Sequence, residues 1–230
     1  MVWWVIIGIL FLIVAFFVFN EIRDRRLLKT VTDSSRGTGT ERDLVLKLLK
    51  SGIPAETIFH DLYLKMYGDN YAQIDLAVIT DVGLIVFEVK DYSGWIFGTG
   101  YQQQWTQVLA YGEKKYRFYN PIMQNAKHIK DLKKHLRQQD IPCFSVIVFY
   151  GDCVLKDIKA IPDKTTLVYS DQVLKVLGGI KRNNETINYN DMQQVVEVLK
   201  KGVVNGGDSN IQAQHIENVN RIIKNKKVFH

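Results

Sequence analysis

A long apolar run at the start of the chain constrains its fold more than any other segment. Residues 2–19 read VWWVIIGILFLIVAFFVF, with no charged side chain and no proline. As an α-helix this run would extend about 27 Å at about 1.5 Å per residue, which matches the hydrocarbon core of a bilayer. The run therefore predicts a transmembrane anchor at residues 1–20, with the rest of the chain folding outside the bilayer.

The charges around this run predict its orientation. Trp3 and Trp4 lie at one end, where amphipathic rings favour the membrane interface, and four cations follow the other end: Arg23, Arg25, Arg26 and Lys29. The positive-inside rule then predicts a single-pass membrane protein with its N-terminus outside and its domain in the cytoplasm. A cleaved signal peptide is the alternative, but its positive charge would precede the apolar run and a small-x-small cleavage site would follow it.

Composition bounds the remainder of the chain. Of 230 residues, 47% are hydrophobic and 23% are charged, which excludes disordered and collagen-like chains. The formal net charge of +6 suits a polyanionic partner such as nucleic acid, or an anionic membrane surface. Cys143 and Cys153 have no neighbouring histidine cluster, so we expect two free thiols in a reducing compartment and no disulfide partner.

Hydrophobic periodicity and turn residues divide the chain into a linker at 21–37, a domain at 38–180 and a C-terminal helical extension at 181–230. Helices are expected at 41–51, 121–139, 171–177, 191–201 and 211–226, with a break at 202–210. Strands are expected at 58–64, 73–80, 83–90, 144–150 and 167–170, with further strand-like sequence at 95–107. This order of elements predicts a mixed α/β domain.

Three charged residues stand in the apolar strands of the hairpin at 73–90. Because side chains alternate along a strand, Glu88 and Lys90 share one face, while Asp75 interrupts the preceding strand. Hairpin pairing can bring Asp75 close to both. Two close carboxylates repel each other, and a hard divalent cation such as Mg²⁺ relieves that repulsion. A structural ion pair between an acid and Lys90 is the alternative explanation.

Several separated motifs resemble a known family. They are Thr40-Glu41, His60-Asp61-Leu62, Gln73-Ile74-Asp75, the run from Gly83 to Ile96, and Asn120-Pro121-Ile122 followed by Gln124, Asn125 and His128. Together they span residues 38–155 and resemble the nuclease-related domain (NERD) family, a branch of the PD-(D/E)xK nuclease superfamily. Thr40 stands where that family prefers glycine.

The resemblance implies a fold and a site. The fold would be a PD-(D/E)xK nuclease-like core, a mixed central sheet flanked by helices. The metal would be Mg²⁺ or Mn²⁺, and its ligands would be Asp75, Glu88, the Val89 carbonyl and Glu41. Lys90 would be the catalytic lysine, and Gln124 would assist it from the later helix.

Basic and aromatic residues indicate nucleic acid as the partner, with DNA favoured over RNA. Lys127, His128, Lys130 and Lys134 on the later helix can contact phosphates, although a solvated helix face is the alternative. Lys114, Lys115 and Arg117 precede that helix and add to its charge. Trp95, Trp105, Tyr92 and Tyr116 can stack on bases, although the tryptophans also suit core packing.

These observations predict a membrane-anchored, metal-dependent nuclease that hydrolyses phosphodiester bonds. Two alternatives remain open at this point. One is a catalytically inactive nucleic-acid-binding module at the membrane, and the other is a scaffold that positions partners there.

Overall fold

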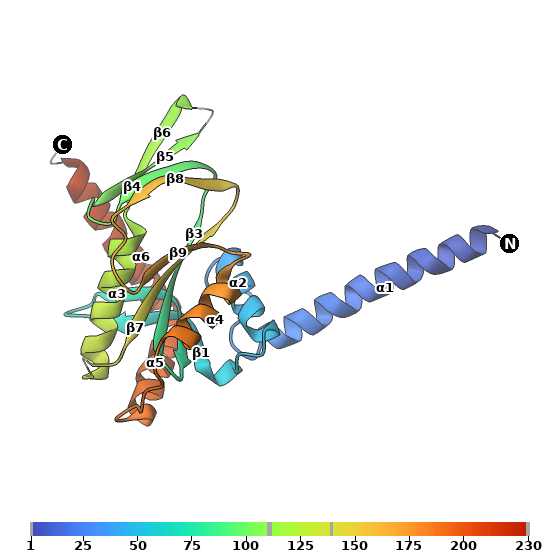
Figure 1. The fold of residues 1–230 in the computed structure, drawn as a ribbon, viewed down its shortest axis with the longest axis horizontal. Helices are drawn as coiled ribbons and strands as arrows, with labels where there is room; N and C mark the ends of the chain where they lie inside the picture. Colours follow the sequence, from blue (N-terminus) through green and yellow to red (C-terminus); the bar gives the residue numbers. More distant parts are fainter. Residues whose placement is uncertain (1, 110–111, 139, 229–230) are drawn as a thin grey trace.

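The computed structural model describes residues 2–109, 112–138 and 140–228 (Figure 1). Its helices are α1 (Val2–Leu28), α2 (Gly39–Lys50), η1 (Ala55–Thr57), α3 (Pro121–Leu136), α4 (Val173–Asn183), α5 (Met192–Gly206) and α6 (Ser209–Val228). Its strands are β1 (Ile58–Lys65), β2 (Tyr71–Thr80), β3 (Gly83–Asp91), β4 (Gly94–Thr99), β5 (Gln104–Leu109), β6 (Lys114–Tyr119), β7 (Cys143–Tyr150), β8 (Cys153–Lys159) and β9 (Thr165–Tyr169).

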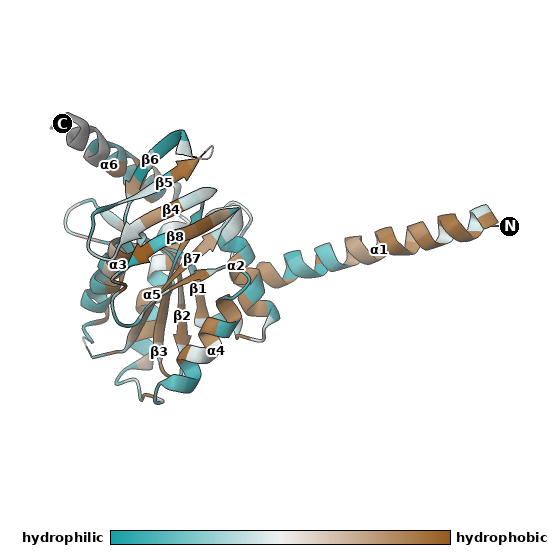
Figure 2. Ribbon diagram, turned by 45° about the horizontal axis from the view of Figure 1, so that its top comes forward, coloured by the Kyte–Doolittle hydropathy of each residue, from teal (hydrophilic) through white to brown (hydrophobic). Residues whose placement is uncertain are grey.

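Helix α1 extends away from the body of the protein, and its apolar segment packs against nothing (Figures 1 and 2). Its most apolar window has a mean hydropathy of 3.0 and is 0% buried, so length and composition would allow it to cross a membrane. A signal sequence near the N-terminus has the same character. The helix continues to Leu28, so the first part of the predicted linker at 21–37 is helical.

The strands form two mixed sheets. Sheet A has the order β1-β2-β3-β7-β9, with β1, β2 and β3 antiparallel and β3, β7 and β9 parallel. Sheet B has the order β6-β5-β4-β8, with an antiparallel meander joined to a parallel pair. The mixed α/β class is confirmed, and sheet A is a mixed sheet with helices on both faces. The second sheet was not expected, and β3 and β7 each lead directly into one of its strands.

Strands β3 and β7 leave sheet A at neighbouring positions, and both segments then enter sheet B. Tyr92 donates its backbone N–H to the Tyr150 carbonyl at 3.2 Å, and Gly94 and Gly151 follow with φ of +74° each. A Cβ at Gly151 would overlap the Tyr92 carbonyl oxygen, so glycine is required where the two chains turn together. The two ends of the parallel pair β3–β7 therefore hold sheets A and B together.

Helices cover both faces of sheet A. One face packs against Leu44 and Leu48 of α2 and Leu177 of α4. The other packs against Leu132 of α3 and Leu199 of α5. Helix α5 is therefore part of the core, although it belongs to the segment 181–230 predicted as an extension.

Three predicted details differ from the structure. Gly202 does not break α5, because it faces β1, where a Cβ would lie 3.2 Å from Leu62 Cβ; glycine permits this close approach, and α5 continues to Gly206. The helix predicted at 121–139 ends at Leu136, where Arg137 adopts a left-handed φ of +53°, and Gln139 lies outside the described residues. Strands β6 and β8 were not expected.

Candidate active site

The centre of the site is the point where β2 and β3 separate. Their ladder ends at the pair Leu76–Phe87, so Asp75 and Glu88 occupy the next positions on the two strands. The Val89 N–H donates to Asp75 Oδ2 at 2.8 Å, which continues the connection between the strands through a side chain. The predicted proximity of the two carboxylates thus follows from the strand register.

Glu88 lies between the side chains of Lys90 and His128. Lys90 Nζ donates to Glu88 Oε1 at 2.5 Å, and His128 Nε2 on α3 lies 3.4 Å from Glu88 Oε2. The second contact is at ion-pair distance without hydrogen-bond geometry, so Glu88 Oε2 is buried and has no hydrogen-bond donor. Glu88 is 1% exposed, and burying a carboxylate so completely is costly unless cations surround it.

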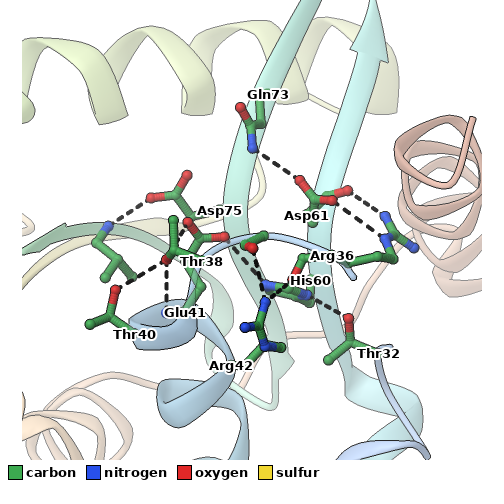
Figure 3. Close-up of polar contacts among 12 residues, drawn as sticks. Thr32, Arg36, Thr38, Thr40, Glu41, Arg42, His60, Asp61, Gln73 and Asp75 are labelled. Carbon is green, nitrogen blue, oxygen red and sulfur yellow. Dashed lines mark hydrogen bonds and ion pairs between the residues drawn. The ribbon is translucent and has the colours of Figure 1, made fainter. Parts of the chain in front are cut away.

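Glu41 enters the site from the first turn of α2. Thr38 caps this helix by accepting from the Glu41 N–H at 3.2 Å, and its hydroxyl donates to Glu41 Oε1 at 2.8 Å. His60 Nε2 lies 3.3 Å from Glu41 Oε2. Figure 3 shows Asp75 beside Glu41 and Thr38, with His60 reaching Glu41 from the other side. The cap therefore begins at Thr38, earlier than the predicted helix start.

Repulsion from the neighbouring carboxylates is reflected in the pKa of Asp75. Burial, together with the charges of Glu88 and Glu41, raises the pKa of Asp75 well above its ordinary value. Burial alone would lower the pKa of Lys90, but the charges of Glu88 and Asp75 raise it. Lys90 is therefore held as an ammonium ion. The positive charge near Asp75 does not offset its burial and the charges of the neighbouring carboxylates.

The donor set fits a hard divalent cation. Two carboxylates come from adjacent strands, and among the described residues one buried oxygen of Glu88 and one of Glu41 have no hydrogen-bond donor. No group of three or more histidine, cysteine or acidic side chains is arranged as a metal site within the described residues. Mg²⁺ is compatible with that finding, because it typically binds one or two carboxylates and retains several waters.

Helix α3 is fixed to both sheets by its two asparagines. Asn120 caps the helix by accepting from the Ile122 N–H at 2.9 Å, and it donates to three carbonyls in the turn between β4 and β5. Asn125 donates to the Val86 carbonyl at 2.8 Å and to Ser145 Oγ at 2.9 Å. These bonds set the position of Gln124, which is half-buried one residue before Asn125.

The basic residues of α3 divide into two groups. His128 is buried against Glu88, so it lies in the acidic cluster, and its predicted contact with phosphate stays a prediction. Lys127 and Lys134 are exposed and pair with Asp131 at 3.0 Å and 3.1 Å. Burial alone would raise the pKa of Asp131, but these two lysines lower it. Lys130 is exposed on the same helix.

Two buried groups near the site were not predicted as site residues. Thr32 Oγ1 lies 2.8 Å from His60 Nδ1, which links the segment after α1 to Glu41 through His60 (Figure 3). Asp61, with a left-handed φ of +54°, accepts from Gln73 at 3.0 Å and pairs with Arg36 Nε at 3.4 Å. The His60-Asp61 dipeptide in a strand was the only sequence signal for either group.

Comparisons with known proteins identify a family and a relative that this chain resembles. The family described as the nuclease-related domain (NERD) matches residues 36–150, which include Glu41, the hairpin and the whole of α3. The uncharacterized protein pXO1-01 of Bacillus anthracis is 31% identical over 151 residues, covering 66% of this chain and 68% of the relative. No solved structure matches the chain.

Proposed function

This chain belongs to the nuclease-related domain family, and from that premise we propose that it is a metal-dependent nuclease, with DNA rather than RNA as its preferred substrate. The observation that carries the proposal is the pairing of Asp75 and Glu88 at the separation of β2 and β3, with Lys90 bonded to Glu88. A buried acidic pair of this kind opposes stability, which points to a functional role.

Asp75 and Glu88 would hold Mg²⁺ or Mn²⁺, together with the Val89 carbonyl and Glu41. When bound, the ion would supply a Lewis acid that polarises the scissile phosphodiester. Lys90 keeps its proton, since its pKa is raised, so its role is to donate to the attacking water or to the developing charge at phosphorus. His128 lies beside Glu88 on α3, and Gln124 would orient the water or a phosphate oxygen from the same helix.

A cleavage assay tests this proposal. The full chain, purified in detergent micelles, is incubated with supercoiled plasmid and Mg²⁺ or Mn²⁺, with EDTA as the metal-free control. We expect nicking that EDTA abolishes and that Asp75→Ala and Lys90→Ala each reduce by about 10²-fold or more. Asp91→Asn, a change at an exposed acid next to Lys90, is the matched control and should cleave normally. Cleavage that persists in both alanine variants would sink the assignment.

One observation favours a second candidate, a nucleic-acid-binding module without catalysis. Both carboxylate oxygens of Glu88 already lie near side-chain nitrogens, one of Lys90 and one of His128, and the described residues contain no three-residue metal cluster. Calorimetric titration with Mg²⁺ or Mn²⁺ separates the two. Binding that Glu88→Ala removes supports the nuclease, while absence of metal binding supports the module or an interaction scaffold.

We further propose that α1 anchors the protein in a membrane, with the domain on the cytoplasmic side. The apolar segment is unburied, and Arg25 and Arg26 lie in the last turn of α1. Protease added outside intact cells should leave the domain intact, and permeabilised cells should lose it. Degradation in intact cells would reverse the topology, and an N-terminus that starts after residue 20 would identify a cleaved signal.

A further inference from the structure

The outer face of sheet B carries aromatic and basic side chains in two ordered rows. In the strand register, Trp95 pairs with Val108 and Val108 with Lys115, while Phe97 pairs with Thr106 and Thr106 with Arg117. Each row thus runs from an aromatic ring on β4 through a small side chain on β5 to a cation on β6. We call these six residues the aromatic platform.

The platform faces away from the core. Ile96 and Trp105, at the alternate positions of β4 and β5, are 0% exposed and pack toward β7 and α3. Trp95 and Phe97 on the opposite face are half-buried, so part of each side chain remains open to solvent. The six platform residues and Gly112 line a hollow of about 670 Å³.

The cations of the platform are available to an external anion. Lys115 and Arg117 are exposed, and neither forms an ion pair with any acid in the described ranges. Lys156 on β8 adds a third cation, since its ammonium lies 5.2 Å from the centre of the Trp95 ring. Asp157 is the acid nearest in sequence on β8, and it pairs with Lys159 at 3.1 Å.

This chemistry fits single-stranded nucleic acid. Half-exposed rings on a sheet face offer stacking surfaces to unpaired bases, and flanking cations follow the phosphate backbone. A duplex fits the platform less well, because its bases are already stacked and its grooves admit a helix or ribbon rather than a flat face. An anionic bilayer is also a poor fit, because sheet B lies apart from α1 in both views (Figures 1 and 2).

We propose that the aromatic platform binds a single strand, with bases on Trp95 and Phe97 and phosphates along Lys115 and Arg117. The inference rests on the proposed nuclease function and specifies its substrate as single-stranded nucleic acid, or a single-stranded stretch next to a duplex. Strand β3 continues into β4, and Trp95 follows Lys90 by five residues, about 17 Å of extended chain at most. The platform therefore begins within a length of a few nucleotides from Lys90.

Fluorescence anisotropy tests nucleic-acid binding by the platform under conditions that prevent cleavage. The full chain in detergent, with EDTA present, is titrated into labelled 20-nucleotide DNA and RNA single strands and into the matching duplex. We expect tighter binding of a single strand than of the duplex. Trp95→Leu and Phe97→Leu, which keep an apolar side chain but remove the ring, should each weaken single-strand binding by about 10-fold. Lys115→Ala with Arg117→Ala should lower the slope of log K against log salt by about 1.4.

Matched controls lie elsewhere in sheet B. Tyr101 is an exposed ring in the turn between β4 and β5, and Lys159 is an exposed cation on β8 that pairs with Asp157. Neither lines the hollow, so Tyr101→Ala and Lys159→Ala should leave binding within twofold of the unmodified chain. Equal loss in these controls, preference for the duplex, or no binding to either single strand would overturn the proposal. So would ring-dependent binding to vesicles containing phosphatidylserine in place of nucleic acid.

The outcomes separate this proposal from the nuclease assignment. If plasmid cleavage depends on Asp75 while the platform variants bind and cleave normally, the platform is refuted and the nuclease stands. If the platform variants lose binding while no substrate is ever cleaved, the nuclease fails and the platform stands as a binding surface.

Discussion

The two sheets differ in where their cationic side chains lie, although one continuous stretch of chain crosses from β3 to β4. At the end of sheet A, Lys90 is largely buried and bonded to Glu88. On the outer face of sheet B, Lys115 and Arg117 are exposed without an acidic partner in the described part of the chain. Buried charges need internal partners, so the arrangement in sheet A is set from within. Sheet B instead leaves its cations for a partner from outside.

The comparison predicts that plasmid cleavage and single-strand binding can be abolished by separate substitutions. Of the substitutions proposed, Glu88→Gln should have the largest effect. The change keeps the size of the side chain but removes a charge from the acidic pair. Loss of several kcal/mol of transition-state stabilisation should slow plasmid cleavage by about 10³-fold. The affinity for a single strand, measured by anisotropy, should change less than twofold. A variant that cleaves within 10-fold of the unmodified rate would break the comparison.

A second prediction concerns stability, since polar groups inside sheet A should hold the fold and those on sheet B should not. Asn125→Leu would leave the Val86 carbonyl and the Ser145 hydroxyl without their shared donor, at a cost of about 2–3 kcal/mol in the free energy of unfolding. Gln104→Leu, at an exposed position on β5, should stay within about 0.5 kcal/mol. Denaturant unfolding of both variants checks this, and equal effects would contradict it.

Much of sheet A could be predicted because its signals are local. Alternation and the turn at Asp81–Gly83 placed β2 and β3 within two residues of their observed bounds, and the apolar run at 144–150 matches β7. The meeting of Asp75 with Glu88 follows from that hairpin. Proline, which is favoured in the first turn of a helix, likewise predicted the start of α3 at Pro121.

The remaining features depend on contacts between distant residues. Strand β6 reads KKYRFY, whose three cations were grouped in the sequence with the basic residues of α3, and only its pairing with β5 makes it a strand. The division into two sheets depends on β3 and β7 turning together at Tyr92 and Gly151, which lie far apart in the sequence. The role of His60 depends on Thr32, 28 residues before it.

A third prediction tests whether that link positions Glu41. Thr32→Val removes the contact with His60 Nδ1 while nearly keeping the volume, and the loosened His60 should no longer hold Glu41. We expect cleavage to fall by about 10-fold in kcat, with KM unchanged. Thr32→Ser should restore the rate, and Thr30→Val, at an exposed threonine just before it, is the matched control. A change in KM, or a rate that Thr32→Ser does not restore, would mean that Thr32 has only a structural role.

The smallest expected effect is a gain in stability from Asp75→Asn. Burial and the charges of Glu88 and Glu41 raise the pKa of Asp75, so its ionised form destabilises the folded state at neutral pH. Asparagine can still accept from the Val89 N–H but carries no charge, and we expect a gain of about 1 kcal/mol in EDTA at pH 7.

The gain in stability from Asp75→Asn should depend on pH and on added metal. Below the ordinary pKa of an aspartic acid, Asp75 is protonated in both the folded and the unfolded chain, so the advantage of Asp75→Asn should disappear on acidification. Added Mg²⁺ should stabilise the unmodified chain and leave the variant unchanged, which reverses their order in thermal unfolding. Asp81→Asn, at the exposed turn of the same hairpin, should show neither response. A loss of stability in Asp75→Asn at neutral pH without metal would mean that this carboxylate serves the fold, and the contrast between the two sheets would then no longer separate function from stability.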